Sequence, residues 1–410
     1  MKRSRSPGSG KPDTTGEAVA AGRGRAAAVL DDVPVTFIGR PFAPVAPGEA
    51  LRGHVMACDA LRLHHRVFEL FPTTRTDPAH RQLMAARERH DLPGGIRIFH
   101  AGGAEVEQAM MAFAESGGRF DDGYNIIVPI YDLPVIPAQW ATQLRRFDEI
   151  WALSGFIRDN LASSGLDSYW IGQTLDPQPG PCLPRRYFGV RESAFVLLHF
   201  FDPSSWVRQR NSHAVLALLD RLRRDDPYRD VQLVLQVLAA GPEDEAWATT
   251  IAGDPQVKVI TTPPDSLHLR SLISACDCVV SLHHAEGGGR DLGEAMAWGR
   301  LAMGTGWSGN LDLMTGENSL LVRHRLVKLK KGDHPHWRGQ SWAEPDLDHA
   351  RDLLRPVLDD PERGRGIARR GQAEVLRSHG RHAVGLRILD RLERIVATAP
   401  RVLRHKRAMA

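Results

Sequence analysis

The sequence predicts an α/β protein with two doubly wound parallel sheets that face a cleft. Short apolar runs of strand character alternate with segments of helical spacing, and this alternation is typical of a parallel sheet covered by helices on both faces. The alternation stops at residues 176–184, which hold four prolines in nine residues, and then resumes. Because no helix or central strand tolerates that density of proline, we place the boundary between two domains there.

The first domain is expected to span residues 34–175. Residues 35–39 have the pattern of a buried strand, and residues 48–62 place apolar side chains at helical spacing. The same pattern then recurs along the domain. Further strands are predicted at 96–99, 125–128 and 149–153, and helices at 104–116, 138–147 and 155–164.

The second domain is expected to span residues 176–380, and a long amphipathic helix within 381–410 is expected to pack back on the first domain. Ligands of open α/β sheets bind at the carboxyl ends of the strands, so a cleft between two such domains suits a large donor molecule. Strands are predicted at 195–200, 231–237, 257–261 and 277–282, and helices at 211–223, 243–252, 266–275, 346–358, 361–377 and 381–396.

Length and composition exclude several other classes of protein. The chain has 410 residues, of which 42% are apolar and 25% charged, which suits a globular protein of two to three domains and rules out collagen, coiled coil and wholesale disorder. The apolar runs stop far short of the roughly 20 residues of a membrane-spanning helix. The first ten residues lack the apolar stretch of a secretory signal. We therefore expect a cytoplasmic protein with four reduced cysteines.

The excess positive charge lies at the amino terminus. Residues 1–30 hold six basic and two acidic residues, a surplus of four that equals that of the whole chain, 53 basic against 49 acidic. The remainder is neutral, so we expect no nucleic-acid partner. Residues 1–33 lack apolar periodicity and are predicted to form a disordered basic tail. We interpret two further basic runs, residues 323–331 and 401–407, as solvated surface. The alternative is that they make peripheral contact with the anionic inner face of a membrane.

Residues 281–299 form the most informative motif. A buried strand runs through three glycines into a helix, and such a loop presents amide groups and the positive end of the helix dipole to a phosphate. Glu286 lies in the loop, and Glu294 is placed in the first turn of the helix. Two carboxylates that faced a phosphate would repel it, so we expect them to face the hydroxyl groups of a ribose or hexose instead. A phosphate site beside carboxylates that bind hydroxyls indicates a nucleotide sugar. Alternatively, Asp291 and Glu294 form a capping box, which leaves Glu286 and the glycines unexplained.

Glu286 and Glu294, separated by seven residues, resemble the signature of glycosyltransferase family 4, and residues 299–310 resemble the strand and glycine turn that follow it. The resemblance covers about residues 34–400. It implies the GT-B fold, in which two Rossmann-like domains hold the donor between them. It also implies a retaining, metal-independent glycosyltransferase of bacterial cell-surface polysaccharide synthesis. Such an enzyme needs no cofactor; its donor substrate is a nucleotide-diphosphate sugar, and its acceptor is a glycan or a lipid-linked molecule.

The resemblance also implies roles for single residues. Glu294 would bind the ribose and Glu286 the donor sugar, while Arg210, where the family has a lysine, would neutralise the diphosphate. An arginine keeps the charge in such an exchange. The implied catalytic residues are His100, Glu286 and Arg210, and the implied donor-binding residues are Arg208, Arg210, Glu286, Gly287, Gly288, Gly289, Arg290 and Glu294.

Two segments of the first domain are further candidates. The turn after the first strand includes Gly48, where a missing side chain would let the backbone approach the donor phosphates. Residues 131–140 resemble a segment that lines the acceptor side in some bacterial members, and surface packing explains them equally well.

Two other functions share this architecture. One is a catalytically silent partner that binds a nucleotide sugar, since the phosphate-binding pair is altered. The other is a nucleotide-sugar epimerase, which would convert the donor with no acceptor present.

Overall fold

The computed structural model describes residues 33–73, 76–177, 180–201, 207–237, 251, 253–261 and 265–399. The predicted tail, the predicted helix at 243–252 and the basic run at 401–407 lie wholly or almost wholly outside these ranges.

The first sheet has six parallel strands in the order β2-β1-β3-β4-β5-β6. The four strands predicted from the sequence are present. Strands β2 and β6 and helix α3 were missed, because all three are short and none shows a clear apolar period. The strands are β1 (Val35–Gly39), β2 (Arg66–Glu69), β3 (Gly95–Gly102), β4 (Gly123–Ile130), β5 (Glu149–Ala152) and β6 (Tyr169–Trp170), and the helices are α2 (Ala46–Ala60), α3 (Pro78–Met84), α4 (Val106–Glu115), α5 (Ala138–Leu144) and α6 (Gly155–Ser163).

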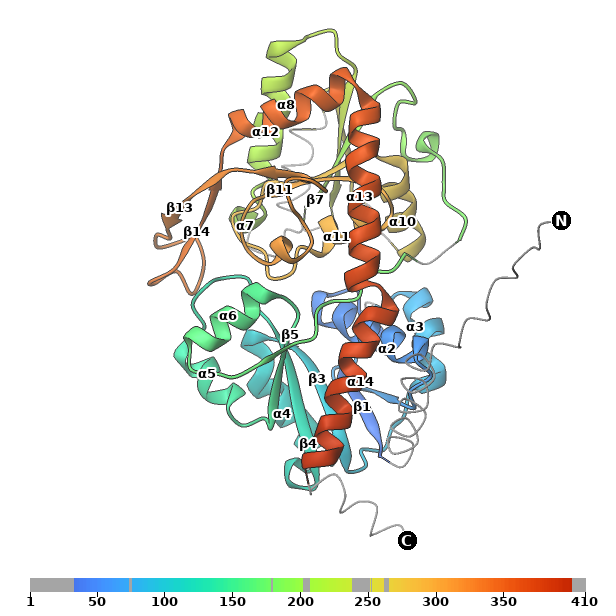
Figure 1. Ribbon diagram of the computed structural model, residues 1–410, viewed down its shortest axis with the longest axis vertical. Helices are drawn as coiled ribbons and strands as arrows, with labels where there is room; N and C mark the ends of the chain where they lie inside the picture. Colours follow the sequence, from blue (N-terminus) through green and yellow to red (C-terminus); the bar gives the residue numbers. More distant parts are fainter. Residues whose placement is uncertain are drawn as a thin grey trace, which may run out of the picture.

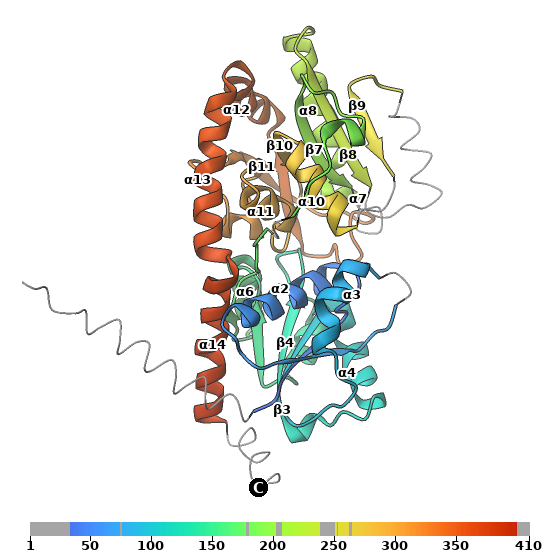
Figure 2. The same ribbon diagram turned by 90° about the vertical axis from the view of Figure 1, so that its right-hand side faces the viewer.

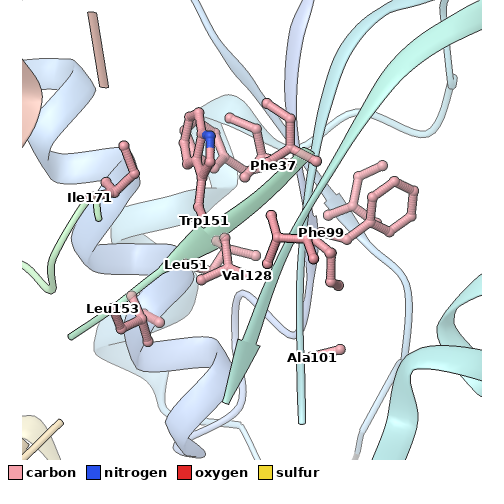
Figure 3. Close-up of a cluster of buried hydrophobic side chains, with 14 of the residues drawn as sticks. Phe37, Leu51, Phe99, Ala101, Val128, Trp151, Leu153 and Ile171 are labelled. Carbon is pink, nitrogen blue, oxygen red and sulfur yellow. The ribbon is translucent and has the colours of Figure 1, made fainter. Parts of the chain in front are cut away.

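The strands of this sheet are mostly apolar because helices cover both of its faces. Figure 3 shows Phe37, Phe99, Val128 and Trp151, from four neighbouring strands, in one buried cluster with Leu51 of α2. Each of these five side chains is at most 1% exposed. The resulting core fixes the positions of the loops that follow the carboxyl ends of the strands.

The second sheet repeats this arrangement with six parallel strands in the order β12-β11-β10-β7-β8-β9. Its four predicted strands are again present within one residue at each end. The strands are β7 (Phe195–Phe201), β8 (Val231–Val237), β9 (Val257–Ile260), β10 (Cys278–Ser281), β11 (Leu301–Thr305) and β12 (Leu320–Val322), and the helices among them are α7 (Val207–Arg210), α8 (Ser212–Asp225), α10 (Ser266–Ala275) and α11 (Arg290–Ala297).

An antiparallel hairpin interrupts the pattern after the second sheet. Strand β13 (His324–Lys328) pairs with β14 (Ser341–Pro345). The sequence indicated only a basic run at the first of these segments, because Leu326 and Val327 are its only apolar residues. The hairpin is a separate two-stranded sheet and extends neither of the large ones.

Three helices end the described chain: α12 (Leu347–Asp359), α13 (Pro361–His379) and α14 (Arg381–Thr398). Figures 1 and 2 show α13 running beside the second domain and α14 continuing beside the first. Val384, Ile388 and Leu392 of α14 are buried in the core of the first domain. The chain therefore crosses twice between the two domains. No helix in the described ranges is both long and apolar enough to cross a bilayer.

Candidate active site

A cavity of about 300 Å³ lies between the two domains. Helices α2 and α3 form one wall, and α10 and α11 form the other. Helices α2 and α11 each follow the carboxyl end of a parallel strand, which is where open α/β sheets bind ligands. The charged and polar side chains that line the cavity include Glu49, Arg52, Asp77, His80, Asp265, Ser266, Arg270, Arg290 and Glu294.

The glycine loop leads from β10 into α11, as predicted. Gly289 is the N-cap of α11 and has φ of 65°, in the left-handed region. A Cβ atom on Gly289 would lie 2.5 Å from the Cβ of Asn310, so both conformation and space require glycine. The first domain also holds this loop, because the Ser154 hydroxyl donates to the carbonyl oxygen of Gly287 over 2.5 Å.

The capping-box interpretation of Asp291 and Glu294 is wrong. Gly289 caps the helix, so Asp291 lies inside the first turn and its carboxylate pairs with Arg210 over 2.8 Å. Glu294 lies in the second turn rather than the first. It pairs with the Arg290 guanidinium, Nε to Oε1, over 2.8 Å. Both carboxylates therefore face charged partners instead of the helix end.

Arg210 is the centre of a cluster of charges. Its Nη1 lies 3.1 Å from Oε2 of Glu286 and 2.8 Å from Oδ2 of Asp291. Burial raises the pKa of the Glu286 carboxyl to about 7; Arg210 opposes the rise, and Asp132 and Asp291 add to it. Glu286 is thus close to half protonated at neutral pH, so it can either donate or accept a hydrogen bond.

Arg290 links the two walls of the cavity. Besides Glu294, it lies 3.5 Å from Oε2 of Glu49, which is in the first turn of α2. Burial alone would raise the pKa of Glu49, but the charges of Arg52, Arg290 and His80 lower it to about 2. The inner part of the cavity therefore holds Arg52, Arg290, Glu49 and Glu294. Arg290 pairs with Glu49 across the cavity and with Glu294 along α11, and Arg52 pairs with Glu49 along α2.

Asp132 is a site residue whose contacts sequence analysis did not predict. It follows the carboxyl end of β4, and its Oδ1 accepts a hydrogen bond from the Gly287 amide over 2.7 Å. Its Oδ2 accepts from the buried amide of Gln209 over 2.7 Å. The available signal was its place just after a strand end, within the segment 131–140, for which the sequence had left an acceptor-side role and surface packing equally open.

His100 does not join this cluster. It lies in β3, is 1% exposed, and its Nε2 is 3.0 Å from Nδ1 of His54. Burial holds the pKa of His100 well below its usual range. Its ring also lies beside that of Phe37, so these contacts place it in the core of the first domain, and it is not among the residues that line the cavity.

Gly48 lies in the first turn of α2 and not in the turn before it. A Cβ atom there would lie 2.5 Å and 2.6 Å from the carbonyl oxygens of Arg40 and Ala43. Packing of the chain on itself therefore explains this glycine. Arg208 lies in α7, but its side chain is outside the described part of the structure.

The fold can be compared with known proteins. No protein-family model and no curated protein sequence matches the chain, whereas solved structures do. HepE from Anabaena, solved with UDP-glucose, matches with a TM-score of 0.63 at 15% sequence identity, and the match covers 88% of this chain and 100% of the HepE chain. A glycosyltransferase from Rickettsia africae matches with a TM-score of 0.64 at 12% identity, over 90% of this chain and 100% of the Rickettsia chain. Sucrose-phosphate synthase from Thermosynechococcus elongatus has a TM-score of 0.63 at 14% identity, also covering 90% and 100%.

The chain has the GT-B fold. In its GT-B arrangement the cavity, the glycine loop and the Arg210 cluster all lie where the two domains meet. Of the predicted residues, Arg290 and Glu294 line the cavity, and Arg210 and Glu286 meet beside it at the start of α11.

Proposed function

We propose that the protein is a retaining glycosyltransferase that moves a sugar from a nucleotide-diphosphate donor to a glycan or lipid-linked acceptor. The observation that supports this most strongly is the placement of Arg210 and Arg290 at the amino terminus of α11. Both guanidinium groups lie at the domain interface of a GT-B fold, next to the glycine loop that leads into this helix. Phosphate groups bind at such helix ends, and arginine binds them bidentately.

In this reaction the enzyme's main task is to stabilise the charge of the departing diphosphate. Arg210 would supply a positive charge there, and the amides at the start of α11 would supply hydrogen bonds. Glu286 and Asp291 hold the Arg210 guanidinium in place from one side. The acceptor hydroxyl attacks the face from which the diphosphate leaves, so the anomeric configuration is retained.

The carboxylates would recognise hydroxyl groups. Glu294 lines the cavity, and we assign it to the ribose of the donor. Glu286 lies beside Gly287, which hydrogen-bonds to the first domain, and we assign Glu286 to the transferred sugar. With a pKa of about 7 it can match a sugar hydroxyl that either donates or accepts a hydrogen bond.

Donor turnover by the purified protein tests the proposal. The protein would be incubated with UDP-, GDP-, dTDP-, CDP- and ADP-sugars, and release of the nucleoside diphosphate would be measured with and without acceptor glycans. Acceptor-stimulated release with an α-linked product from an α-linked donor is the expected result. Binding without release would instead support a silent partner, and conversion of the donor sugar without release would support an epimerase.

Activity is expected to persist in EDTA, because basic side chains and amides can neutralise the diphosphate without a cation. The one Asp-x-Asp sequence, Asp346 and Asp348, does not suggest a metal clamp: the Asp346 carboxylate caps α12 by accepting from the amide of His349 over 3.0 Å. Turnover with EDTA would be compared with turnover in added magnesium or manganese. Complete loss in EDTA that either metal restores would rule out the metal-independent mechanism.

Replacing Glu294 by glutamine is expected to weaken binding of the nucleoside diphosphate about tenfold, because hydrogen bonds to a charged acceptor contribute about 1.5–3 kcal/mol. Calorimetric titration measures the change. Glu115→Gln, at an exposed position near the end of α4, is the matched control. Unchanged affinity in a folded Glu294→Gln variant would show that the ribose binds elsewhere.

A further inference from the structure

The β13–β14 hairpin carries a charged surface to which the proposed function assigns no role. Residues 323–345 hold six basic and two acidic residues. Arg323 pairs with Asp346 over 3.1 Å. The exposed side chains of Arg325, Lys328, Lys330 and Lys331 have no ion-pair partner within the described ranges. This segment therefore presents four cations whose charge is not balanced locally.

An apolar side chain lies among these cations. Side chains alternate between the two faces of a strand, and here Val327 and Leu329 pack on the core of the first domain. Leu326 and Lys328 therefore point the other way, whereas Arg325 lies on the same face as Val327. Leu326 is 57% exposed. Single exposed leucines are common, but this one stands in the middle of a basic strand.

The hairpin is held rigidly by both domains. The side-chain amide of Gln340 makes two hydrogen bonds to the backbone of Val135. Its Nε2 donates to the carbonyl oxygen of Val135 over 2.7 Å, and its Oε1 accepts from the backbone N–H of Val135 over 2.9 Å. In the second domain, Ala343 donates its amide to the carbonyl oxygen of His284 over 2.9 Å. Figure 1 shows the hairpin at the side of the molecule where the two domains meet. The basic face is thus preformed beside the interface that holds the candidate active site.

We propose that this face of the hairpin docks the protein on an anionic phospholipid bilayer. Lys328 and the neighbouring Lys330 and Lys331 would contact the lipid headgroups, and Leu326 would enter the boundary between headgroups and acyl chains, as apolar residues of interfacial segments do. A polyanionic glycan fits less well, because it would leave the exposed apolar side chain of Leu326 in water.

If the proposed function holds, a lipid-linked acceptor would reach the domain interface from the same bilayer. The docking itself does not depend on that function, since it follows from the exposed side chains of the hairpin. It can therefore be tested without measuring turnover.

The test is sedimentation of the full-length protein with vesicles. One set would contain phosphatidylglycerol and phosphatidylcholine in equal amounts, and the other phosphatidylcholine alone. The double variant Lys328→Glu and Lys330→Glu is expected to bind the anionic vesicles at least tenfold more weakly than the wild type. Leu326→Ser is expected to weaken binding less, and its effect is expected to persist at salt concentrations that screen the charges.

A matched control separates docking from net charge. Arg363→Glu with Arg369→Glu changes the charge by the same amount at exposed positions of α13, away from the hairpin. This variant is expected to bind like the wild type. Equal loss in both double variants would overturn the proposal, as would wild-type binding by the hairpin variant or no preference of the wild type for anionic vesicles. Binding to soluble dextran sulfate but not to vesicles would likewise overturn it. Thermal melting would verify that each variant is folded.

Discussion

Replacing Arg210 by alanine is expected to lower turnover of the nucleotide-sugar donor by at least 100-fold. Removing one electrostatic donor from an active site costs roughly 3 kcal/mol of transition-state stabilisation, and Arg210 is the guanidinium that contacts both Glu286 and Asp291. Without it, two partly buried carboxylates face each other and an anionic leaving group. The measurement is kcat/KM for the donor under saturating acceptor.

Two further variants show whether that loss reflects the charge. Arg210→Lys keeps a cation that can reach a phosphate, so it is expected to retain turnover within about tenfold of the wild type. Arg224→Ala removes an exposed arginine of α8 and is expected to change nothing. Normal turnover by a folded Arg210→Ala variant would mean that the diphosphate is held elsewhere, with Arg208 as the next residue to test.

Replacing Glu286 by glutamine is expected to stabilise the protein at alkaline pH while lowering its activity. The pKa of this carboxyl is raised from 4.5 to about 7 in the fold. Between pH 4.5 and about pH 7, Glu286 has lost its proton in the unfolded chain but still holds it in the folded chain, so the free energy of unfolding falls as pH rises. The rise in pKa corresponds to about 3 kcal/mol. Glutamine resembles the neutral acid, and Arg210 keeps Asp291 as a partner.

Urea denaturation at pH 4.5 and pH 8 measures this effect. The two proteins are expected to be equally stable at the lower pH, and the variant is expected to be more stable by about 3 kcal/mol at the higher pH. A difference that does not change with pH would show that Glu286 is ionised throughout. Such a gain in stability with a loss of turnover is typical of a buried charge kept for function.

The fold was largely predictable because both sheets are parallel and buried on both faces. Strands such as β7 and β8 are seven-residue segments in which apolar residues predominate, so their positions were predicted within a residue. The missed elements have a different character. Strand β2 is four residues long with a charged residue at each end, and β13 has only two apolar residues between basic ones on an isolated hairpin. Neither has the longer, mostly apolar run on which the prediction depends.

Apart from Arg210, which the family resemblance supplied, the candidate site was predictable only where its residues are close in sequence. Glu286, Arg290 and Glu294 come from one loop and helix, so their common location followed from the motif. The contacts of Asp132 with Gly287, and of Glu49 with Arg290, join residues of different domains. Such contacts depend on how the domains pack, which local sequence patterns do not encode.

The most direct test of the account is a thermal-shift series with UDP, GDP, dTDP, CDP and ADP, run on the wild type and on Arg210→Ala. A nucleotide present at a hundred times its dissociation constant stabilises the folded state by about 2.7 kcal/mol. We expect at least one of the five to raise the melting temperature of the wild type, and to raise that of Arg210→Ala much less. If none of the five shifts the melting of the folded wild-type protein, the interface between the two domains is not a nucleotide-diphosphate site and the account is contradicted.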